Sequence, residues 1–268
     1  MGCHFGNYNH PPSFNSTVID AVDGKRNSRI AKVSAHFGPQ HPAYEQALLT
    51  HHRHADLHNY PIFDLKTTII DDLWNKPAHL LSIIMDELLK PEDRRLQWLF
   101  WFDRDTVILN HCMPLHIFLP PQETTNIIIS NDFNGLNNGV FGIRVCEWSV
   151  RLLSPILGYR ELRPDEDLPF TEQSAMEKVL QDDRFKEGAV YYPQRWFNAY
   201  PTSKEKDYTV RDADLLVHFA GVGDRLEQIS KWIQRVDAEP DTWALNYRVT
   251  AIPEEIFDFW KDLHQQHK

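Results

Sequence analysis

The sequence predicts an α/β protein in which a mostly parallel sheet is flanked by helices. Apolar segments of strand length alternate along the chain with longer segments whose apolar residues recur at helical spacing. Parallel strands need a crossover connection, which is usually a helix, so this alternation favours a mostly parallel sheet covered on both faces. The chain has 268 residues with 42% hydrophobic content, enough for a sizeable buried core.

The expected elements follow one another in order. Residues 1–29 are polar and contain Pro11-Pro12 and Asp23-Gly24, so they are expected to form a flexible tail or stem remnant. Short apolar runs or apolar alternation predict strands at 29–38, 60–66, 96–102, 126–132, 139–145, 188–193 and 214–221. A helical repeat of apolar residues predicts helices at 42–58, 75–90, 147–157, 172–183, 224–236 and 254–266.

Composition excludes several classes of protein. The formal charge is −10 and Lys and Arg are not clustered, which argues against a nucleic-acid partner. No apolar run approaches the roughly 18 residues that a membrane span requires, and the N-terminus lacks the pattern of a signal peptide. The motifs GxSxG, GxxxxGK[ST] and GxGxxG are absent. Their absence argues against a serine hydrolase, a P-loop nucleoside triphosphatase and a dinucleotide-binding enzyme, respectively.

Two groups of potential ligand residues do not form a recognised metal motif. The three cysteines include no CxxC pair, which leaves one disulfide plus one free thiol open. The segment HHRHADLH, residues 51–58, contains His54 and His58 one helical turn apart, but no HExxH motif accompanies them. We therefore expect this segment to be the polar face of a helix.

Two aspartates one residue apart follow the apolar run 96–102. Side chains two residues apart in an extended chain point to the same side, so Asp103 and Asp105 can face one point. The carboxyl ends of strands are where open α/β sheets bind ligands. Two carboxylates suit Mg²⁺ or Mn²⁺. The alternative is an exposed turn with two solvated aspartates.

A histidine stands at the end of another apolar strand, in DLLVHFAG (214–221). Neutral imidazole is a good ligand for divalent transition metals, so His218 is a candidate ligand. Gly221 and Gly223 would let the backbone approach a bound ligand closely. The alternative is a hydrogen-bonded histidine of the core.

Amides are concentrated in NDFNGLNNGVFGIR, residues 131–144. A loop with so many donors and acceptors would suit sugar hydroxyls, although Asn-Gly is also a strong signal for a β-hairpin turn. Further along, Glu172 and Gln173 open a helix, where an acid favours the helix dipole. In a sugar-transferring site the same pair could face the anomeric carbon.

Taken together, these segments resemble glycosyltransferase family 34, the galactosyl-, mannosyl- and xylosyltransferases of fungi and plants, and most of all its fungal branch. The resemblance spans about residues 31–225, in the family's order. The matching stretches are WNKPAHLL (74–81), WLFWFDRDTVILN (98–110), NDFNGLNNGVFGIR (131–144), EQSAMEKVL (172–180), YPQRWFNAY (192–200) and DLLVHFAG (214–221).

The resemblance implies a GT-A fold, a nucleotide-sugar donor, a glycan acceptor, a Mn²⁺ ion with Mg²⁺ as the alternative, and transfer with retention of anomeric configuration. It implies one catalytic domain over residues 30–268. Within it we expect a nucleotide-binding half at about 30–110, a donor and acceptor half at about 111–225, and C-terminal helices from about 225.

The resemblance also implies roles for individual residues. Asp103, Asp105 and His218 would hold the metal, with Asp105 the direct ligand and Asp103 on the ribose side. The residues implied in catalysis are Gln173, Glu172 and Asp132. Those implied in binding the donor are Asp103, Asn137, Asn138, Gly139, Lys76, Gly221 and Arg225.

The chain departs from the family at two positions near HFAG. Val222 stands where members often have Cys, and Arg225 would take the place of a Lys that contacts the diphosphate.

Three hypotheses remain open from the sequence. The first is a Mn²⁺-dependent retaining glycosyltransferase using UDP-galactose, UDP-xylose or GDP-mannose. The second is a metal-dependent phosphohydrolase, and the third is a non-catalytic glycan- or nucleotide-sugar-binding subunit of a glycosyltransferase complex. Because family enzymes are usually type II Golgi membrane proteins, we expect the Golgi lumen if an anchor has been removed, and otherwise a soluble protein; homo- or hetero-oligomers stay open.

Overall fold

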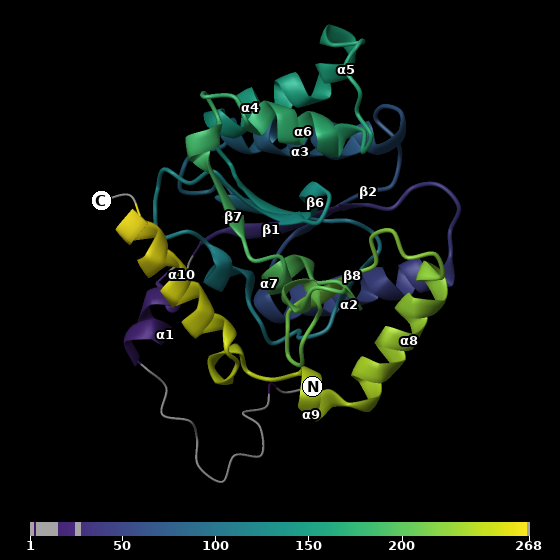
Figure 1. The fold of residues 1–268 in the computed structure, drawn as a ribbon, viewed down its shortest axis with the longest axis vertical. Coiled ribbons are helices and arrows are strands. Elements are labelled where there is room, and N and C mark those ends of the chain that lie inside the picture. The colour runs from purple at the N-terminus through teal and green to yellow at the C-terminus, as the bar shows by residue number, and fades with distance from the viewer. Residues whose placement is uncertain (1–2, 4–15, 25–27, 267–268) are drawn as a thin grey trace.

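A six-stranded sheet in the order β2-β1-β3-β6-β5-β7 separates two layers of helices (Figure 1). The computed structural model describes residue 3 and residues 16–24 and 28–266. The strands are β1 (Ile30–Ala35), β2 (Ile62–Leu65), β3 (Trp98–Phe102), β4 (Thr106–Ile108), β5 (Ile127–Asp132), β6 (Gly135–Arg144), β7 (Ala189–Tyr192) and β8 (Leu216–His218). The helices are α1 (Ser16–Asp23), α2 (Pro42–His58), α3 (Asn75–Leu88), α4 (Glu147–Leu157), α5 (Tyr159–Leu162), α6 (Glu172–Leu180), α7 (Arg195–Asn198), α8 (Arg225–Ala238), α9 (Pro240–Trp243) and α10 (Ile252–Gln266).

The predicted fold class is confirmed. Strand β1 pairs in parallel with both β2 and β3, and β5 pairs in parallel with β7. Only β6 runs against its neighbours, between β3 and β5. The sheet is therefore mostly parallel, with one reversed strand that brings a hairpin to the edge where β1 and β3 end.

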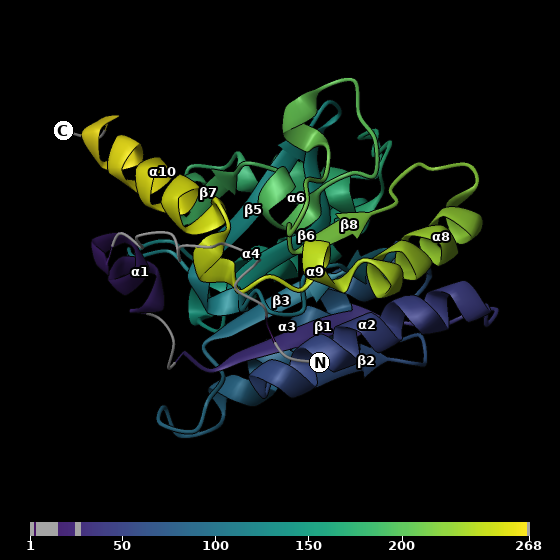
Figure 2. The same cartoon turned by 90° about the horizontal axis from the view of Figure 1, so that it is seen from below.

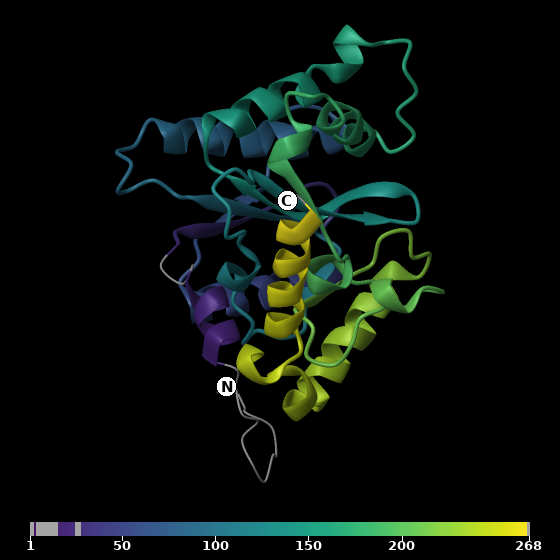
Figure 3. The same ribbon diagram turned by 60° about the vertical axis from the view of Figure 1, so that its left-hand side comes forward.

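Alternation along the strands builds a core on each face of the sheet. In β3, Leu99 and Trp101 face α3, α4 and α6, whereas Trp98, Phe100 and Phe102 face the opposite layer. All five side chains are buried, which explains why this strand is a continuous apolar run. Figure 3 shows the two layers above and below the sheet.

A two-stranded sheet of β4 and β8 lies under the ends of the main strands and connects them to α2 and α8. Thr106 pairs with His218 in antiparallel register. Val107 and Val217 are buried with Phe219, Ile229 and α2 in a third apolar cluster. This small sheet holds the segment after β3 against the segment that carries His218.

The expectation of a tail over residues 1–29 is wrong for residues 16–23, which form α1. Val18 and Val22 are buried, and α1 lies beside α10, the last helix of the chain (Figures 1 and 2). An eight-residue helix is marginal on its own, so tertiary packing supplies its stability. The rest of that segment, except residues 3, 24, 28 and 29, lies outside the described residues.

The cysteine pattern resolves into one bridge and one free thiol. Cys3 forms a disulfide with Cys112, 109 residues away, and Cys146 is free. The bridge attaches the beginning of the chain to the segment after β4. No helix in the described part of the chain combines the length and apolar character that crossing a bilayer would take.

The prediction that residues 51–58 form a polar helix face is wrong for two histidines. His51 and His54 are buried on the inner side of α2, because each finds partners there. Lys32 on β1, itself buried, lies 3.2 Å from Nδ1 of His54, and Nε2 of His54 donates to the carbonyl of Met113 at 2.9 Å. Burial lowers the pKa of Lys32 and of both histidines well below their usual values.

These histidines should make folding sensitive to acid. Below pH 6.5 the unfolded chain protonates His54 but the folded chain does not. The free energy of unfolding therefore decreases by about 1.4 kcal/mol for each pH unit that the pH is lowered, for each such group. In urea unfolding between pH 6.5 and 5, His54→Asn should flatten this dependence by about that amount. His52→Asn, which changes a more exposed histidine of the same helix, is the control. Parallel pH profiles for the two variants would contradict the prediction.

Candidate active site

A cleft of about 960 Å³ lies at the carboxyl ends of β1 and β3, beside the turn of the β5–β6 hairpin. Its walls come from the segment after β1, the start of α3, the segment between β3 and β4, the hairpin, the start of α6 and the segment from β8 to α8. Eleven of the twelve site residues expected from the sequence line it: Lys76, Asp103, Asp105, Asp132, Asn137, Asn138, Glu172, Gln173, His218, Gly221 and Arg225. The twelfth, Gly139, lies directly against His218.

Asp103, Asp105 and His218 converge at one point of the cleft. One ligand atom from each lies within 4.8 Å of the others. The backbone N–H of Asp103 donates to the carbonyl of Gly139 at 2.8 Å, and the hydroxyl of Thr106 donates to the carbonyl of Asp103 at 2.7 Å. These bonds hold the turn after β3, so the aspartates are placed by the strand before them and by β4 after them.

Positive charge surrounds the buried carboxylate of Asp105. Nε2 of His218 lies 3.4 Å from one oxygen, and Arg225 from α8 lies 3.1 Å from the other. Burial by itself would raise the pKa of Asp105, but the charges of His218 and Arg225 and a hydrogen bond outweigh it and bring the pKa to about 2. Asp105 is thus an anion at neutral pH.

A chain of hydrogen bonds places a proton on Nδ1 of His218. The carboxylate of Asp132 can only accept hydrogen bonds, so the group of Asn137 that faces it at 2.9 Å is the Nδ2 donor. The oxygen of Asn137 therefore accepts, from the backbone N–H of Gly139 and from Asn198, each at 2.9 Å. The oxygen of Asn198 then faces Nδ1 of His218 at 2.8 Å and must receive its proton.

Nε2 is therefore the nitrogen that faces the Asp105 carboxylate, 3.4 Å away. Such a pair is stable only with positive charge between its members, supplied either by a proton on Nε2 or by a metal ion in its place. Carboxylate oxygens with one imidazole nitrogen fit a divalent ion such as Mn²⁺. A hydrogen bond on the far nitrogen is the usual support of a metal-binding histidine. The residues therefore fit the metal that the fold family implies.

A second charged cluster surrounds Lys76, which is buried at the start of α3. Its ammonium lies 3.1 Å from Asp103 and 3.1 Å from Glu172, and it donates to the side chain of Asn138 at 2.8 Å. Burial would lower the pKa of Lys76, but the two carboxylates outweigh it and raise the pKa. Lys76 thus links the metal-side aspartate to the acid that opens α6.

The amide-rich segment 131–144 is a hairpin rather than a loop, so the alternative signalled by Asn-Gly is correct. Only Phe133 and Asn134 lie between β5 and β6. Asn137 and Asn138 stand on β6, both buried. A strand fixes side chains more firmly than a loop, and the backbone N–H of Asn138 donates to Oε1 of Gln173 at 3.1 Å.

Three residues that the sequence did not single out complete the network. Asn198 orients His218, and the hydroxyl of Tyr200 donates to Asp132. Burial and Asp132 raise the pKa of that hydroxyl. Trp101 donates to Asp103 at 2.7 Å. Asn198 and Tyr200 belong to YPQRWFNAY, and Trp101 to WLFWFDRDTVILN, so the resemblance was the available signal.

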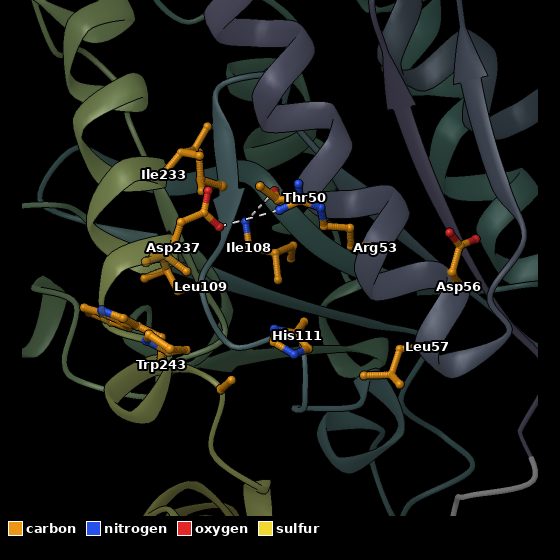
Figure 4. A pocket seen from close by; sticks show the side chains of 14 residues that line it. Thr50, Arg53, Asp56, Leu57, Ile108, Leu109, His111, Ile233, Asp237 and Trp243 are labelled. Carbon is orange, nitrogen blue, oxygen red and sulfur yellow. Dashed lines mark hydrogen bonds and ion pairs between the residues drawn. The ribbon is translucent and has the colours of Figure 1, made fainter. Parts of the chain in front are cut away.

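A second cavity, of about 480 Å³, lies between α2, α8, α9 and the strand that follows Asp105 (Figure 4). Its walls are largely apolar, including Leu109, Ile233 and Trp243. The charges at Arg53 and Asp237 are paired with each other at 3.6 Å. The convergent carboxylates and amides lie in the larger cleft, so we assign the chemistry there.

Removing the support of His218 should weaken metal binding. Asn198→Ala deletes the acceptor that holds Nδ1–H, and the loss of such a partner typically costs 10- to 100-fold in metal affinity. We expect a loss of this size for Mn²⁺, measured by electron paramagnetic resonance titration. Tyr200→Phe removes another hydrogen bond of the network but leaves the link to His218, so its affinity should stay close to that of the unmodified chain. Equal affinities for all three proteins would contradict the relay.

Gly139 leaves no room for a side chain. A Cβ there would lie 2.1 Å from Cε1 of His218. Gly139→Ala should therefore displace the imidazole, lower Mn²⁺ affinity by at least about tenfold and lower the free energy of unfolding by roughly 1–3 kcal/mol. Gly223→Ala is the control, since its Cβ would meet open space. The prediction fails if both variants bind Mn²⁺ as the unmodified chain does.

Comparison with known proteins finds similar sequences and one similar fold. The model of the galactosyl transferase GMA12/MNN10 family matches residues 116–225. An uncharacterized alpha-1,2-galactosyltransferase of Schizosaccharomyces pombe is 24% identical over 229 residues, covering 67% of this chain and 64% of the relative. A second uncharacterized alpha-1,2-galactosyltransferase of that yeast is 27% identical over 180 residues, covering 55% and 47%. The chain thus spans about half to two thirds of the length of these relatives.

A solved structure supports the fold. A glycosyltransferase involved in the glycosylation of the major capsid of PBCV-1 superposes with a TM-score of 0.58 at 13% identity, covering 78% of this chain and 98% of that one. This likeness establishes a GT-A fold. The family match over residues 116–225 and the two yeast relatives make the chain similar to the galactosyl transferase GMA12/MNN10 family, glycosyltransferase family 34.

Proposed function

We propose that this chain is a Mn²⁺-dependent retaining glycosyltransferase that moves a hexose or pentose from a nucleotide sugar to a glycan acceptor. The observation that carries the proposal is the convergence of Asp103, Asp105 and an oriented His218 in the cleft at the end of β3. Because the two yeast relatives are named alpha-1,2-galactosyltransferases, UDP-galactose is the first donor to test, before UDP-xylose and GDP-mannose.

The metal would be held by Asp105 and His218, with Asp103 beside them. When bound, Mn²⁺ would supply positive charge to the diphosphate as it leaves the sugar. Lys76 and Arg225 border the same point from opposite elements, α3 and α8. We assign both to the diphosphate, for which each offers a fixed cationic group.

The donor sugar would lie against β6 and the start of α6. Asn138 and Gln173 offer amide groups to its hydroxyls, and the backbone at Gly221 lies across the cleft. Glu172 is buried and forms an ion pair with Lys76 at 3.1 Å. We assign Glu172 and Gln173 to the face of the anomeric carbon, where a carboxylate would stabilise positive charge as the diphosphate departs.

Asp132 is assigned a supporting role in this proposal. Its carboxylate is bound by Asn137 and Tyr200 and by the backbone N–H of Asn134. A carboxylate engaged in this way orients the amides around the sugar and, through Asn137, the metal-side histidine. Orientation of this kind places the acceptor hydroxyl and the anomeric carbon at reacting distance.

A thermal-shift panel tests the proposal. Ligand that binds only the folded state raises Tm, and saturation at about 100 times Kd should give about 5 °C or more. We expect one nucleotide family, UDP or GDP, to produce this shift only with Mn²⁺. Asp105→Asn should abolish it, whereas Asp237→Asn, at the rim of the second cavity, should retain it. A shift that survives Asp105→Asn would contradict the assigned metal site.

Turnover then separates the remaining alternatives. Transfer of the sugar to an added glycan supports the transferase. Breakdown of the nucleotide sugar to a nucleoside monophosphate and a sugar phosphate, at a rate that no glycan changes, would favour the phosphohydrolase. Metal-dependent binding without any turnover would favour a non-catalytic subunit.

A further inference from the structure

Exposed aromatic side chains are few in this protein, and they are not scattered. Among the described residues, the exposed Phe, Tyr and Trp side chains are Phe133, Phe170 and Tyr191, at 67%, 44% and 40%. Phe133 and Phe170 line the cleft, whereas Tyr191 lies on β7 away from it. An aromatic ring left in water at the mouth of a cleft indicates a binding surface.

The backbone holds Phe133 firmly although its ring is exposed. It occupies the turn between β5 and β6, where the backbone N–H of Asn134 donates to Asp132 at 2.6 Å. Its ring meets Tyr200 edge to face, with centroids 6.2 Å apart. The hairpin is also fixed to α6, since the N–H of Leu136 donates to Glu177 at 3.0 Å. Figure 3 shows the hairpin projecting to one side of the sheet.

The sheet order places this ring on one particular side of the metal residues. β3, which leads to Asp103 and Asp105, has β1 on one side and the β6–β5 hairpin on the other. Along β6, Gly139 lies against His218, and Gly135 follows the turn that holds Phe133. The two glycines are four positions apart along the strand, roughly 13 Å. If the nucleotide occupies the half formed by β1 and β3, as the proposed function requires, Phe133 would lie beyond the donor sugar, at the opposite end.

The groups around Phe133 match the chemistry of a sugar ring. Pyranose rings carry C–H groups on one face and hydroxyls at their edges. The π face of Phe133 is the negative part of its quadrupole and attracts polarised C–H groups. The exposed side chain of Asn134 lines the cleft beside it and can bind hydroxyls. An apolar partner would desolvate this amide without pairing it.

Resting on the proposed transferase function, we propose that Phe133 is a stacking platform for a saccharide ring of the acceptor. The acceptor class is then a glycan that presents the C–H face of a pyranose, either the ring that bears the attacking hydroxyl or the next one. The nucleotide and metal make no contact with this ring. Phe133 therefore sets acceptor affinity and leaves donor binding unchanged.

The test compares Phe133→Ala, Phe133→Tyr and Tyr191→Ala. The probes are methyl α-D-galactopyranoside, methyl α-D-mannopyranoside and methyl β-D-glucopyranoside with their disaccharides, in the presence of Mn²⁺ and UDP. Saturation-transfer NMR gives Kd for each glycoside. We expect Phe133→Ala to weaken binding of the best glycoside by about 5- to 20-fold, Phe133→Tyr to restore it, and Tyr191→Ala to leave it unchanged.

Donor binding is measured on the same proteins by the Mn²⁺-dependent thermal shift. If this shift is present throughout but Phe133→Ala binds glycosides as the unmodified chain does, the platform is overturned and the transferase proposal stands. The platform is likewise overturned if the shift is present but the unmodified chain binds no glycoside of the panel. If no nucleotide gives a metal-dependent shift in any of the proteins, the proposed function fails and the platform fails with it.

Discussion

The surrounding structure has to hold His218 close to Asp105. Nε2 of His218 and a carboxylate oxygen of Asp105 lie 3.4 Å apart, an arrangement that needs a proton or a metal ion between them. The surrounding structure maintains this arrangement from both sides. β4 pairs with β8 to set the separation, and Gly139 lacks the side chain that would push the imidazole away. Thus the antiparallel pairing of two three-residue strands, remote in sequence, sets the position of the Asp105–His218 pair in a mostly parallel fold.

The hydrogen-bond relay behind His218 joins the Asp105–His218 pair to the β5–β6 hairpin. Asp132 stands at the end of β5 in the hairpin, yet its acceptor character determines how Asn137 and Asn198 are oriented. A change at the hairpin would therefore affect the histidine through these two amides, because their hydrogen bonds do not allow the flipped orientation. A buried network of this kind destabilises the fold when some of its polar groups lack a hydrogen-bond partner. This accounts for the burial of so many polar side chains in one region.

Sequence patterns predicted the strands well because β3 and β5 are buried on both faces and read as continuous apolar runs. The same patterns placed Asp103 and Asp105 at a strand end, which is a local property of the chain. Asn198 and Tyr200 could not be predicted by pattern, since their partners lie 20 to 68 residues away and depend on how α7 meets β6. His51 and His54 were misjudged for a similar reason. A histidine on a helix appears polar until its partners, Lys32 on β1 and the carbonyls of Thr106 and Met113, are known.

Charge balance explains why an acidic protein would bind a diphosphate in this cleft. Five carboxylates and three basic side chains line it, which gives a net charge of −2. Two of the basic groups, Lys76 and Arg225, are already paired with Asp103 and Asp105. A phosphate group entering alone would meet a negative surface whose cations are engaged. Lys76 and Arg225 become free for phosphate only when the two aspartates find another cation, so donor and metal should bind interdependently.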